Sequence, residues 1–490
     1  MASCREIPCI YQPSQQHKIK MNKFTLGMIG LGTMGRNLLL NMADNGFQVT
    51  GYDKDPKMLQ KLEEDGKAHE LKGYDSLEDF IASLELPRRI MLLVPAGKIV
   101  DSVISELKPL LDEGDIVIDS GNSHFSDTSR RALELSENGI HFFGMGISGG
   151  EEGARFGPSM MPGGDKAAYD AVKPILEAVS AKVKGDPCVA YIGPGAAGHF
   201  VKMVHNGIEY SMMQILAETY DILKNALGYN NEQIYSLFEK WNNGRLKSFL
   251  LEVTRDIFKV KDEKTGKYLL DVIKDEAKSK GTGKWTSQVS MDLQTPIPTI
   301  NESVTARDLS KFKSLRIALS KALPSQTTEI ADKAAFEVKL EQALYFAMIT
   351  SYAQGLHLLE QASIEFEYEL NLKEISQIWR GGCIIRAELL EDIYQAYTKQ
   401  SDLPHLYSDA GVQQKLSNIV LPTREIVISA IQNGIAVPCF ASALTYFDSL
   451  RTDKSPLNLT QAQRDFFGAH TFERVDEEGI FHADWNANNL

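Results

Sequence analysis

Five polar side chains recur at helical spacing in the stretch HFVKMVHNGIEYSMM. They fall at positions i, i+3, i+4, i+7 and i+8, which places them on one face of a helix: Lys202, His205, Asn206, Glu209 and Tyr210. A face that meets only water usually carries lysine and glutamate freely, whereas this one mixes histidine, asparagine and tyrosine. Lys202 and Glu209 lie about 10 Å apart along the helix axis, so a base and an acid can reach different carbons of one sugar-sized substrate. A solvent-exposed helix face is the alternative interpretation.

A glycine turn near the start of the chain predicts a dinucleotide site. The stretch GLGTMG fits the GxGxxG pattern between a strand and a helix, where backbone amides can meet a pyrophosphate. Asp53 follows at about the 20-residue distance at which an acid accepts hydrogen bonds from the ribose 2′-hydroxyl, although a solvated turn aspartate is the alternative. The expected cofactor-binding residues are Gly30, Gly32, Thr33, Met34, Gly35, Asp53, Lys54, Val94, Ala96 and Asn122.

Two neighbouring features have structural explanations. Asp55-Pro56 is typical of a helix N-cap followed by a proline at the first helical position. A second GxGxxG match, GPGAAG from Gly193 to Gly198, opens the long helix and lacks an acid at a following strand end. We interpret this second match as close packing at a domain junction.

Basic residues elsewhere in the chain offer contacts for an anion. The stretch KSKGTGKWT surrounds glycines with lysines, among them Lys280, and presents amide and ammonium groups that suit a phosphate. Arg307 in NESVTARDLS, and Arg464 and His470 in QAQRDFFGAH, add further groups. Taken singly, the lysine-rich stretch also fits a flexible surface loop, and the arginines fit surface ion pairs.

The elements that must position these residues follow from hydrophobic periodicity. Residues 23–53 have the order apolar run, glycine turn, amphipathic stretch and apolar run, which predicts a βαβ unit. Further strand-like runs, IMLLVPA, DIVIDSGN and IHFFGMGISGG, end in small or turn residues. They predict a parallel, doubly wound sheet whose ligands lie at the carboxyl ends of the strands.

Long helical patterns dominate from about Ala196 onward. We therefore expect an α/β Rossmann-like dinucleotide-binding domain at residues 21–195 and a large all-α domain for substrate binding and dimerisation at residues 196–453. Residues 1–20 are expected to form a disordered extension. Residues 454–490 form a C-terminal tail that is aromatic yet too short for a core of its own, so it is expected to pack on another surface.

The composition disfavours several classes of protein. The 490 residues are 43% hydrophobic and 24% charged, which is typical of a globular protein with two or three domains. The net charge of −13 disfavours nucleic acid and acidic membranes as partners, and no apolar run is long enough to span a bilayer. The opening residues contain no secretory signal. The five cysteines lack metal-ligand spacing, so we expect reduced thiols, a cytoplasmic location and no metal site.

Six stretches resemble the 6-phosphogluconate dehydrogenase family, in order and at compatible spacing, from Lys23 to about Glu473. They are IGLGTMGRNL, IDSGNSHF, GISGGEEGARFGPSMMPGG, GHFVKMVHNGIEY, KGTGKWT and QAQRDFFGAHT. The resemblance implies oxidative decarboxylation of 6-phosphogluconate to ribulose 5-phosphate and CO2. It also implies a Rossmann domain joined to a helical domain, NADP as the usual cofactor, and a homodimer.

The resemblance also implies roles for particular residues. The family's base corresponds to Lys202, which takes the proton of the C3 hydroxyl while hydride leaves C3 for the nicotinamide. The family's acid corresponds to Glu209, which protonates C1 of the enediol left after loss of CO2. Sugar-acid contacts correspond to Asn122, Ser148, Gly149, Gly150, His205 and Asn206, phosphate contacts to Tyr210, Lys280 and Arg307, and contacts lent by the partner subunit's tail to Arg464 and His470.

One stretch departs from the family's pattern. NADP-using members usually carry an Asn-Arg-Thr-like turn where this chain has Asp53-Lys54-Asp55. A carboxylate about 5 Å from a 2′-phosphate repels it by about 3 kcal/mol at an effective dielectric near 20, or roughly a hundredfold in affinity. Lys54 offsets this in part only, because an ammonium lacks the planar fork of arginine. We therefore expect NAD to be favoured, with dual use or NADP as the alternatives.

Two rival functions are compatible with parts of the sequence. Another β-hydroxyacid dehydrogenase, such as a hydroxyisobutyrate or tartronate semialdehyde enzyme, would share the glycine turn and a lysine like Lys202, but those chains are much shorter. A noncatalytic dinucleotide sensor is the second rival. The retention of both Lys202 and Glu209 argues against it.

Overall fold

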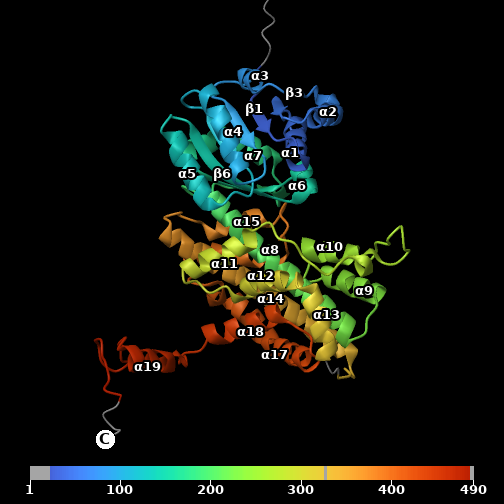
Figure 1. The fold of residues 1–490 in the computed structure, drawn as a ribbon, viewed down its shortest axis with the longest axis vertical. Coiled ribbons are helices and arrows are strands. Elements are labelled where there is room, and N and C mark those ends of the chain that lie inside the picture. The colour runs from blue at the N-terminus through green and yellow to red at the C-terminus, as the bar shows by residue number, and fades with distance from the viewer. Residues whose placement is uncertain (1–22, 325–327, 486–490) are drawn as a thin grey trace, which may run out of the picture.

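The computed structural model describes residues 23–324 and 328–485. The expectation for residues 1–20 therefore lies outside the described residues. Figure 1 shows an α/β layer at one end, a helical body in the middle, and a tail helix that stands away from the body.

A seven-stranded sheet with the order β3-β2-β1-β4-β5-β6-β7 forms the α/β layer (Figure 1). The strands pair in parallel except for β7, which runs antiparallel to β6 at the edge. The expected parallel, doubly wound sheet is confirmed, and the antiparallel edge strand is a difference. The strands are β1 (Leu26–Ile29), β2 (Val49–Tyr52), β3 (Gly73–Tyr74), β4 (Arg89–Leu92), β5 (Ile116–Asp119), β6 (His141–Ser148) and β7 (Ser159–Gly164), and a separate hairpin pairs β8 (Lys182–Val183) with β9 (Asp186–Pro187).

Helices cover both faces of this sheet because successive strand residues point to opposite sides. Met28 packs into one apolar cluster with α1 and α7, whereas Ile29 packs into another with α3, α4 and α5. The expected cap at Asp55 is confirmed, since its carboxylate accepts a hydrogen bond from the Lys57 amide at 3.0 Å. The helices are α1 (Thr33–Asp44), α2 (Pro56–Asp65), α3 (Leu77–Ala82), α4 (Lys98–Leu107), α5 (Phe125–Ser136), α6 (Gly150–Phe156) and α7 (Lys166–Val179), with short 3-10 turns at η1 (Lys67–His69) and η2 (Lys108–Leu110).

A long helix, α8 (Ala197–Asp221), joins the sheet to the helical body (Figure 1). Its first turn contains Gly198, where a Cβ would clash with the carbonyl oxygens of Met161 and Gly144. The interpretation of GPGAAG as a close-packing motif at the junction is therefore confirmed. This close approach sets the start of α8 directly against β6 and β7.

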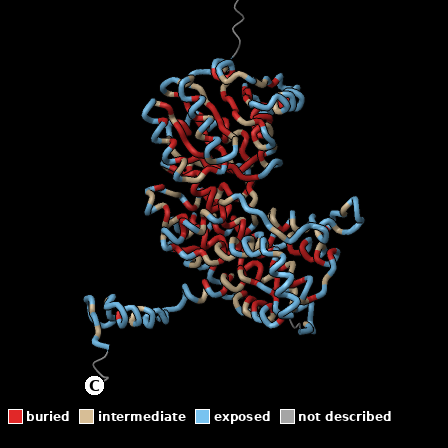
Figure 2. Tube along the Cα trace, viewed as in Figure 1, coloured by how far each residue is buried: buried red, intermediate tan, exposed pale blue. Residues whose placement is uncertain are grey.

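The helical body packs around α8 and the 33-residue helix α14. Figure 2 shows buried backbone along the centre of both the sheet and this body. The remaining helices are α9 (Asn231–Asn242), α10 (Phe249–Ile257), α11 (Thr282–Asp292), α12 (Pro298–Ser310), α13 (Lys313–Ala322), α14 (Lys333–Glu365), α15 (Leu372–Trp379), α16 (Leu389–Lys399), α17 (Ala410–Gln432) and α18 (Pro438–Leu450), with η3 (Ile222–Ala226), η4 (Leu269–Val272) and η5 (Leu406–Ser408) between them.

The 3-10 segment η4 spans Leu269–Val272 and is tied to α9, because the Asn231 side chain donates a hydrogen bond to Asp271 at 3.1 Å. None of the helices in the described ranges is both long and apolar enough to cross a membrane.

The tail begins after α18 and contains α19 (Leu457–Gly468). It is almost entirely exposed in the single chain (Figure 2). Asp465 organises it locally, because its carboxylate accepts hydrogen bonds from the Thr471 amide at 2.9 Å and the Trp485 indole at 2.8 Å. A short antiparallel bridge pairs Phe472 with Phe481. As far as residue 485, the last that the structure describes, the tail is ordered within itself and does not pack on the body of its own chain (Figure 2).

A buried carboxylate on α8 holds the start of α18. Glu218 accepts hydrogen bonds from the Cys439 amide at 3.0 Å and the Phe440 amide at 3.1 Å. Backbone amides in the first turn of a helix have no partner within that helix. Burial raises the pKa of Glu218 to about 7, although these hydrogen bonds act to lower it.

We predict that the Glu218 carboxyl makes the protein less stable as the pH rises from about 4.5 to about 7. The folded chain keeps the Glu218 proton up to about pH 7, whereas the unfolded chain loses it near 4.5, so the folded state binds more protons in this window. Between pH 4.5 and pH 7, the wild-type protein should lose about 3 kcal/mol of unfolding free energy relative to the Glu218→Gln protein. Thermal unfolding of both proteins over this pH range measures the difference. Parallel stability curves would contradict the prediction.

Candidate active site

The polar face of α8 is buried between the sheet and the helical body. Lys202 is 6% exposed, His205 is 0% exposed and Asn206 is 8% exposed. Tyr210 is also buried, and Glu209 is partly exposed. The alternative of a solvent-exposed helix face is therefore wrong, because four of these five side chains are almost completely removed from water.

Lys202 lies against β6 and is held by its own helix. Its ammonium nitrogen donates a hydrogen bond to Asn206 Oδ1 at 2.8 Å, and His205 Nδ1 lies 3.5 Å away. The absence of a side chain at Gly146 makes room for the lysine, since a Cβ there would clash with the Lys202 side chain. A strand glycine of this kind marks a close approach that no other residue permits.

Burial shifts the pKa values of the polar side chains on α8 in directions that suit proton transfer. It lowers the pKa of Lys202, although the Glu209 carboxylate acts to raise it. Burial raises the pKa of Glu209, although Lys202 and Arg307 act to lower it. Burial also places the pKa of His205 well below its ordinary value, and the Lys202 charge adds to that shift. A neutral lysine and a protonated glutamate are therefore both more accessible near neutral pH than in water.

The carboxyl end of β6 lies beside this helix face. Ser148 Oγ lies 3.3 Å from His205 Nε2 and accepts a hydrogen bond from the Ile384 amide at 3.2 Å. The backbone then turns through Gly149 (φ 132°) and Gly150 (φ 64°), a conformation that favours glycine. The structure thus brings Ser148 next to the α8 face, and Gly149 and Gly150 follow it directly along the chain.

Arg307 and Tyr210 meet at the far end of the same face. The Arg307 guanidinium lies over the Tyr210 ring, 3.4 Å from its centroid. Within the described residues, no carboxylate forms an ion pair with Arg307. Helix α11 packs closely against the Tyr210 ring, because Gly283 has no side chain at the point of contact. Lys280 lies in the exposed segment just before α11, so its loop adjoins this basic end of the face.

The glycine turn after β1 has the geometry expected for a dinucleotide. Gly30 has φ 95°, and a Cβ at Gly35 would clash with the Gly30 carbonyl. Gly32 precedes α1, whose first amides receive no side-chain cap. These N–H groups are therefore available to a pyrophosphate at the helix N-terminus. Thr33 and Met34 are the first two residues of this helix.

Asp53 and Lys54 lie at the carboxyl end of β2, beside the glycine turn. Asp53 accepts hydrogen bonds from the Leu31 amide at 2.7 Å and from the Asp55 amide at 2.9 Å. The Lys54 ammonium forms an ion pair with Glu106 at 2.8 Å. Glu106 was not predicted, because nothing in the local spacing of the sequence relates position 54 to position 106.

The loops after β4 and β5 complete the crevice. Strand order reverses between β1 and β4, which is where an open α/β sheet binds its ligand. Val94 and Ala96 lie in the loop after β4, and Asn122 lies exposed in the loop after β5. A Cβ at Gly121 would lie 3.2 Å from the Val94 carbonyl oxygen, so the two loops touch.

Arg464 and His470 are not brought to this site within one chain. Both are exposed on the tail, and Arg464 donates a hydrogen bond to the nearby Gln461 side chain at 2.9 Å. In Figure 1 the tail helix α19 stands on the opposite side of the helical body from the sheet.

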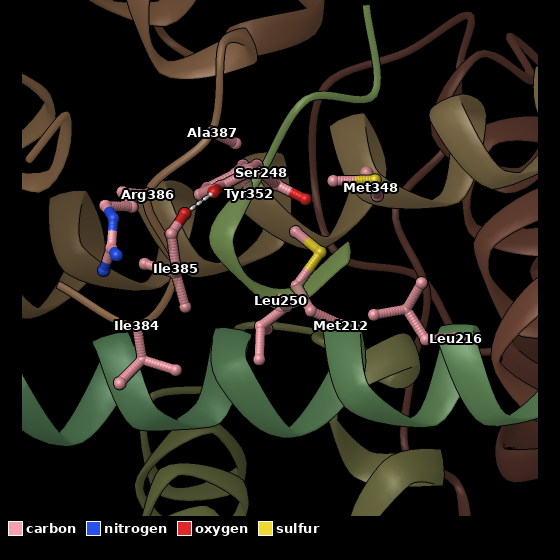
Figure 3. A pocket seen from close by; sticks show the side chains of 10 residues that line it. All are labelled: Met212, Leu216, Ser248, Leu250, Met348, Tyr352, Ile384, Ile385, Arg386 and Ala387. Carbon is pink, nitrogen blue, oxygen red and sulfur yellow. Dashed lines mark hydrogen bonds between the residues drawn. The ribbon is translucent and has the colours of Figure 1, made fainter. Parts of the chain in front are cut away.

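A small apolar pocket lies behind the polar face of α8. It is lined by residues such as Met212, Leu216, Leu250 and Ile384, and the Tyr352 hydroxyl donates a hydrogen bond to the Ile385 carbonyl at its rim (Figure 3). Its free volume of about 10 Å³ holds no more than one water. This pocket is therefore a packing gap and not a substrate site. Among the described residues, no group of three or more His, Cys, Asp or Glu side chains is arranged to hold a metal ion.

The fold and the glycine turn define a two-domain dinucleotide-binding protein. Residues 25–193 match the NAD binding domain of 6-phosphogluconate dehydrogenase, and residues 198–485 match the C-terminal domain of 6-phosphogluconate dehydrogenase. The chain belongs to the 6-phosphogluconate dehydrogenase family.

Full-length relatives support this assignment. The decarboxylating 6-phosphogluconate dehydrogenase of Lactococcus lactis is 50% identical over 95% of this chain and 99% of its own. The NADP(+)-dependent, decarboxylating enzyme of Bacillus subtilis is 49% identical over 95% of this chain and 100% of its own. The solved 6-phosphogluconate dehydrogenase of Plasmodium falciparum, described in its apo form, with NADP+ and with 6-phosphogluconate, matches with a TM-score of 0.91 and 44% identity over 94% of this chain and 100% of its own.

Proposed function

We propose that the protein catalyses the oxidative decarboxylation of 6-phosphogluconate to ribulose 5-phosphate and CO2 with reduction of NAD(P). The observation that carries this proposal is the pair of buried Lys202 and partly buried Glu209 on one face of α8, next to the dinucleotide crevice. The relatives in Lactococcus lactis and Bacillus subtilis are decarboxylating 6-phosphogluconate dehydrogenases, and the Plasmodium falciparum enzyme is described in complex with 6-phosphogluconate. A shorter β-hydroxyacid dehydrogenase does not account for the agreement over the full length of these relatives. A noncatalytic sensor does not account for a buried base and an acid on one helix face.

The first step is oxidation at C3 of the sugar acid. Lys202 in its neutral form takes the proton of the C3 hydroxyl, and the lowered pKa makes that form accessible. A bound nicotinamide dinucleotide supplies the acceptor for the hydride that C3 loses. Asn206 keeps the lysine in place through its hydrogen bond, and the product of this step is a 3-keto acid with a protonated lysine beside its new carbonyl.

The second step is loss of CO2 from the keto acid. The carboxylate is β to the C3 carbonyl, so the bond between C1 and C2 breaks as its electron pair moves toward that carbonyl. Lys202, now an ammonium, donates its proton to the carbonyl oxygen and leaves an enediol. The same residue therefore serves as base and then as acid, and it returns to its neutral form.

The third step is protonation of the enediol to give ribulose 5-phosphate. Glu209 lies two turns along α8 from Lys202, and its raised pKa keeps a proton on the carboxyl at a higher pH than usual. It donates that proton to C1 of the product, while the neutral Lys202 takes the proton of the C2 hydroxyl as that carbon becomes the carbonyl. The substrate contacts that we propose lie around these two residues: Asn122, Ser148, Gly149, Gly150, His205 and Asn206 at the sugar acid, and Tyr210, Lys280 and Arg307 at the phosphate.

The dinucleotide lies along the crevice between the glycine turn and the loops after β4 and β5. We propose NAD as the favoured form, because Asp53 presents a carboxylate at the end of β2 and Glu106 adds another beside Lys54. Exposed ion pairs are weak, so Lys54 can still turn toward a phosphate, but the local charge stays unfavourable for one. The domain bounds predicted from the sequence and a cytoplasmic location are part of the same proposal.

The exposed tail supports a homodimer in which Arg464 and His470 of one chain reach the substrate phosphate of the other. Its internal hydrogen bonds to Asp465 order it without contact to its own body. Such a crossing would add positive charge to the basic end of the α8 face, where Arg307 has no carboxylate partner among the described residues.

We predict that Lys202→Ala lowers hydride transfer by on the order of 10²- to 10⁴-fold. Glu209→Gln should still form reduced dinucleotide, but slowly over repeated turnovers, because each enediol is protonated without its acid. Single-turnover absorbance of the reduced nicotinamide measures the first step, and release of ribulose 5-phosphate measures the last. Lys399→Ala, an exposed lysine at the end of α16, is the control and should leave both rates unchanged. Near-normal turnover by Lys202→Ala would show that the base is wrongly assigned.

We predict that kcat/KM with NAD exceeds kcat/KM with NADP at matched ionic strength. Asp53→Asn should narrow this ratio by on the order of 10-fold to 100-fold, because it removes a unit charge beside the 2′-position. Glu63→Gln on α2 removes an exposed charge elsewhere and is the control. A preference of the wild-type protein for NADP would contradict the proposed role of Asp53.

We predict that two inactive chains restore activity when they form mixed dimers. Lys202→Ala lacks the base but has an intact tail, whereas Arg464→Ala has an intact base but a defective tail. In a hybrid dimer the normal tail meets the normal base in one of the two sites. Activity should appear when the two proteins are unfolded and refolded together. Its absence in a mixture shown by mass spectrometry to contain hybrids would mean that the tail does not cross.

A further inference from the structure

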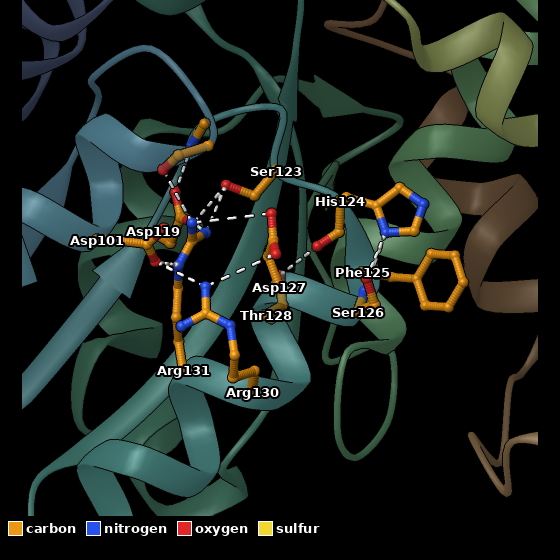
Figure 4. A network of polar contacts seen from close by, with 12 residues as sticks. Asp101, Asp119, Ser123, His124, Phe125, Ser126, Asp127, Thr128, Arg130 and Arg131 are labelled. Carbon is orange, nitrogen blue, oxygen red and sulfur yellow. Dashed lines mark hydrogen bonds and ion pairs between the residues drawn. The ribbon is translucent and has the colours of Figure 1, made fainter.

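A charged side chain is fully buried beneath the dinucleotide crevice. Arg131, on α5, is 0% exposed, and each nitrogen of its guanidinium has a partner (Figure 4). Its Nε donates to Asp101 Oδ1 at 2.8 Å, and Nη2 donates to the Gly97 carbonyl at 3.0 Å. Its Nη1 lies 3.2 Å from Ser123 Oγ and 3.3 Å from Asp119 Oδ2.

These partners come from two segments of the chain, one running from the loop after β4 into α4 and the other from the last residue of β5 into the loop that follows it. Gly97 and Asp101 follow β4, whereas Asp119 and Ser123 lie at the end of β5 and beyond. The two strands are neighbours in the sheet, with Leu92 paired to Asp119. One guanidinium therefore spans the carboxyl ends of two adjacent parallel strands and fixes the separation of the loops that leave them.

The contacts lie next to residues that we assign to ligand binding. Gly97 directly follows Ala96, and Ser123 directly follows Asn122. Asp119 tightens the second loop further, since it accepts hydrogen bonds from the Gly121 amide at 3.1 Å and from Ser123 Oγ at 2.6 Å. Hydrogen bonds to Asp119 therefore anchor Gly121 and Ser123, the residues on both sides of Asn122.

The same helix also contacts α8. Thr128 lies three residues before Arg131 on α5, and its hydroxyl lies 2.6 Å from His199 Nδ1. His199 lies three residues before Lys202 on α8, and it is fully buried against Gly144. Helix α5 therefore links the two loops to the helix that carries the base.

A gain in stability does not explain this network. Removing a guanidinium and its carboxylates from water costs about as much as their pairing returns, and apolar replacements are often equally stable. The planar fork of arginine instead imposes directions on several partners at once. Such a network suits a place where two loops must keep a fixed relative position.

We propose that Arg131 is a positioning residue that aligns the dinucleotide loop after β4 with the substrate loop after β5 for hydride transfer. This inference rests on the proposed function, since it takes the roles of Ala96, Asn122 and Lys202 from there. Hydride transfer needs the donor carbon and the acceptor close and aligned, and a shift of about 1 Å can cost on the order of 100-fold in rate.

The test compares Arg131→Lys, which keeps the charge but loses the fork, with the wild-type protein. We expect kcat per folded active site to fall by on the order of 10-fold to 100-fold. The deuterium isotope effect on kcat, measured with substrate deuterated at C3, should rise because hydride transfer becomes the slow step. Arg130→Lys is the matched control, because Arg130 also contacts Asp101 at 2.8 Å but is exposed and reaches neither loop backbone. It should leave both quantities unchanged.

A folded Arg131→Lys protein with wild-type kcat and isotope effect would overturn the inference. A loss of activity that only matches the loss of folded protein, with KM and the isotope effect unchanged, would overturn it as well. If Arg131→Lys does not fold, Asp101→Asn decides by the same readouts, because Asp101 is partly exposed and anchors the guanidinium from one side. Failure of the wild-type protein to turn over 6-phosphogluconate in the same assay would refute the proposed function instead.

Discussion

The transfer of Lys202 from water into the junction between sheet and helical body is the constraint on which the site depends. An ammonium with no full ion pair is costly to bury, and the cost shows as a lowered pKa. The surrounding backbone is built to allow this position. Gly146 and Gly198 remove side chains from the surfaces that meet, which lets α8 approach β6 closely. A larger residue at either place would separate the base from the crevice.

The long helix α8 carries the residues that we propose for catalysis and also joins the sheet to the helical body. Its first turns carry the base and its hydrogen-bond partner, and its later turns carry the acid and the aromatic ring beneath Arg307. Glu218, further along, caps α18, the last helix before the tail. Because α8 is one continuous helix, it fixes the relative positions of the residues that we propose for the sugar acid, of those that we propose for the phosphate, and of α18, which precedes the tail. The dinucleotide approaches the same face from the carboxyl ends of the strands.

Much of this arrangement could be predicted from the sequence, because it is encoded in local spacing. The period of the helix places Lys202 and Glu209 on one face, and the glycine turn after the first strand marks the pyrophosphate position. The edge strand β7 was not predicted, because its residues, SMMPGG, include a proline and two glycines and no β-branched residue. Arg131 was also missed, because its partners lie 8 to 34 residues away along the chain and meet only through the sheet. Burial of the α8 face was inferred from its composition and could be established only from the packing of β6 against it.

The most direct test is the pKa of Lys202 itself. Lysine labelled with 13C at Cε gives a resonance that follows the charge of each side chain, and the Lys202→Arg protein identifies the resonance that belongs to position 202. We predict that this resonance titrates clearly below 10.5, the ordinary value for lysine, because burial disfavours the charged form. A Lys202 resonance that titrates at or above 10.5 would contradict the role of this residue as a base that is neutral when substrate binds.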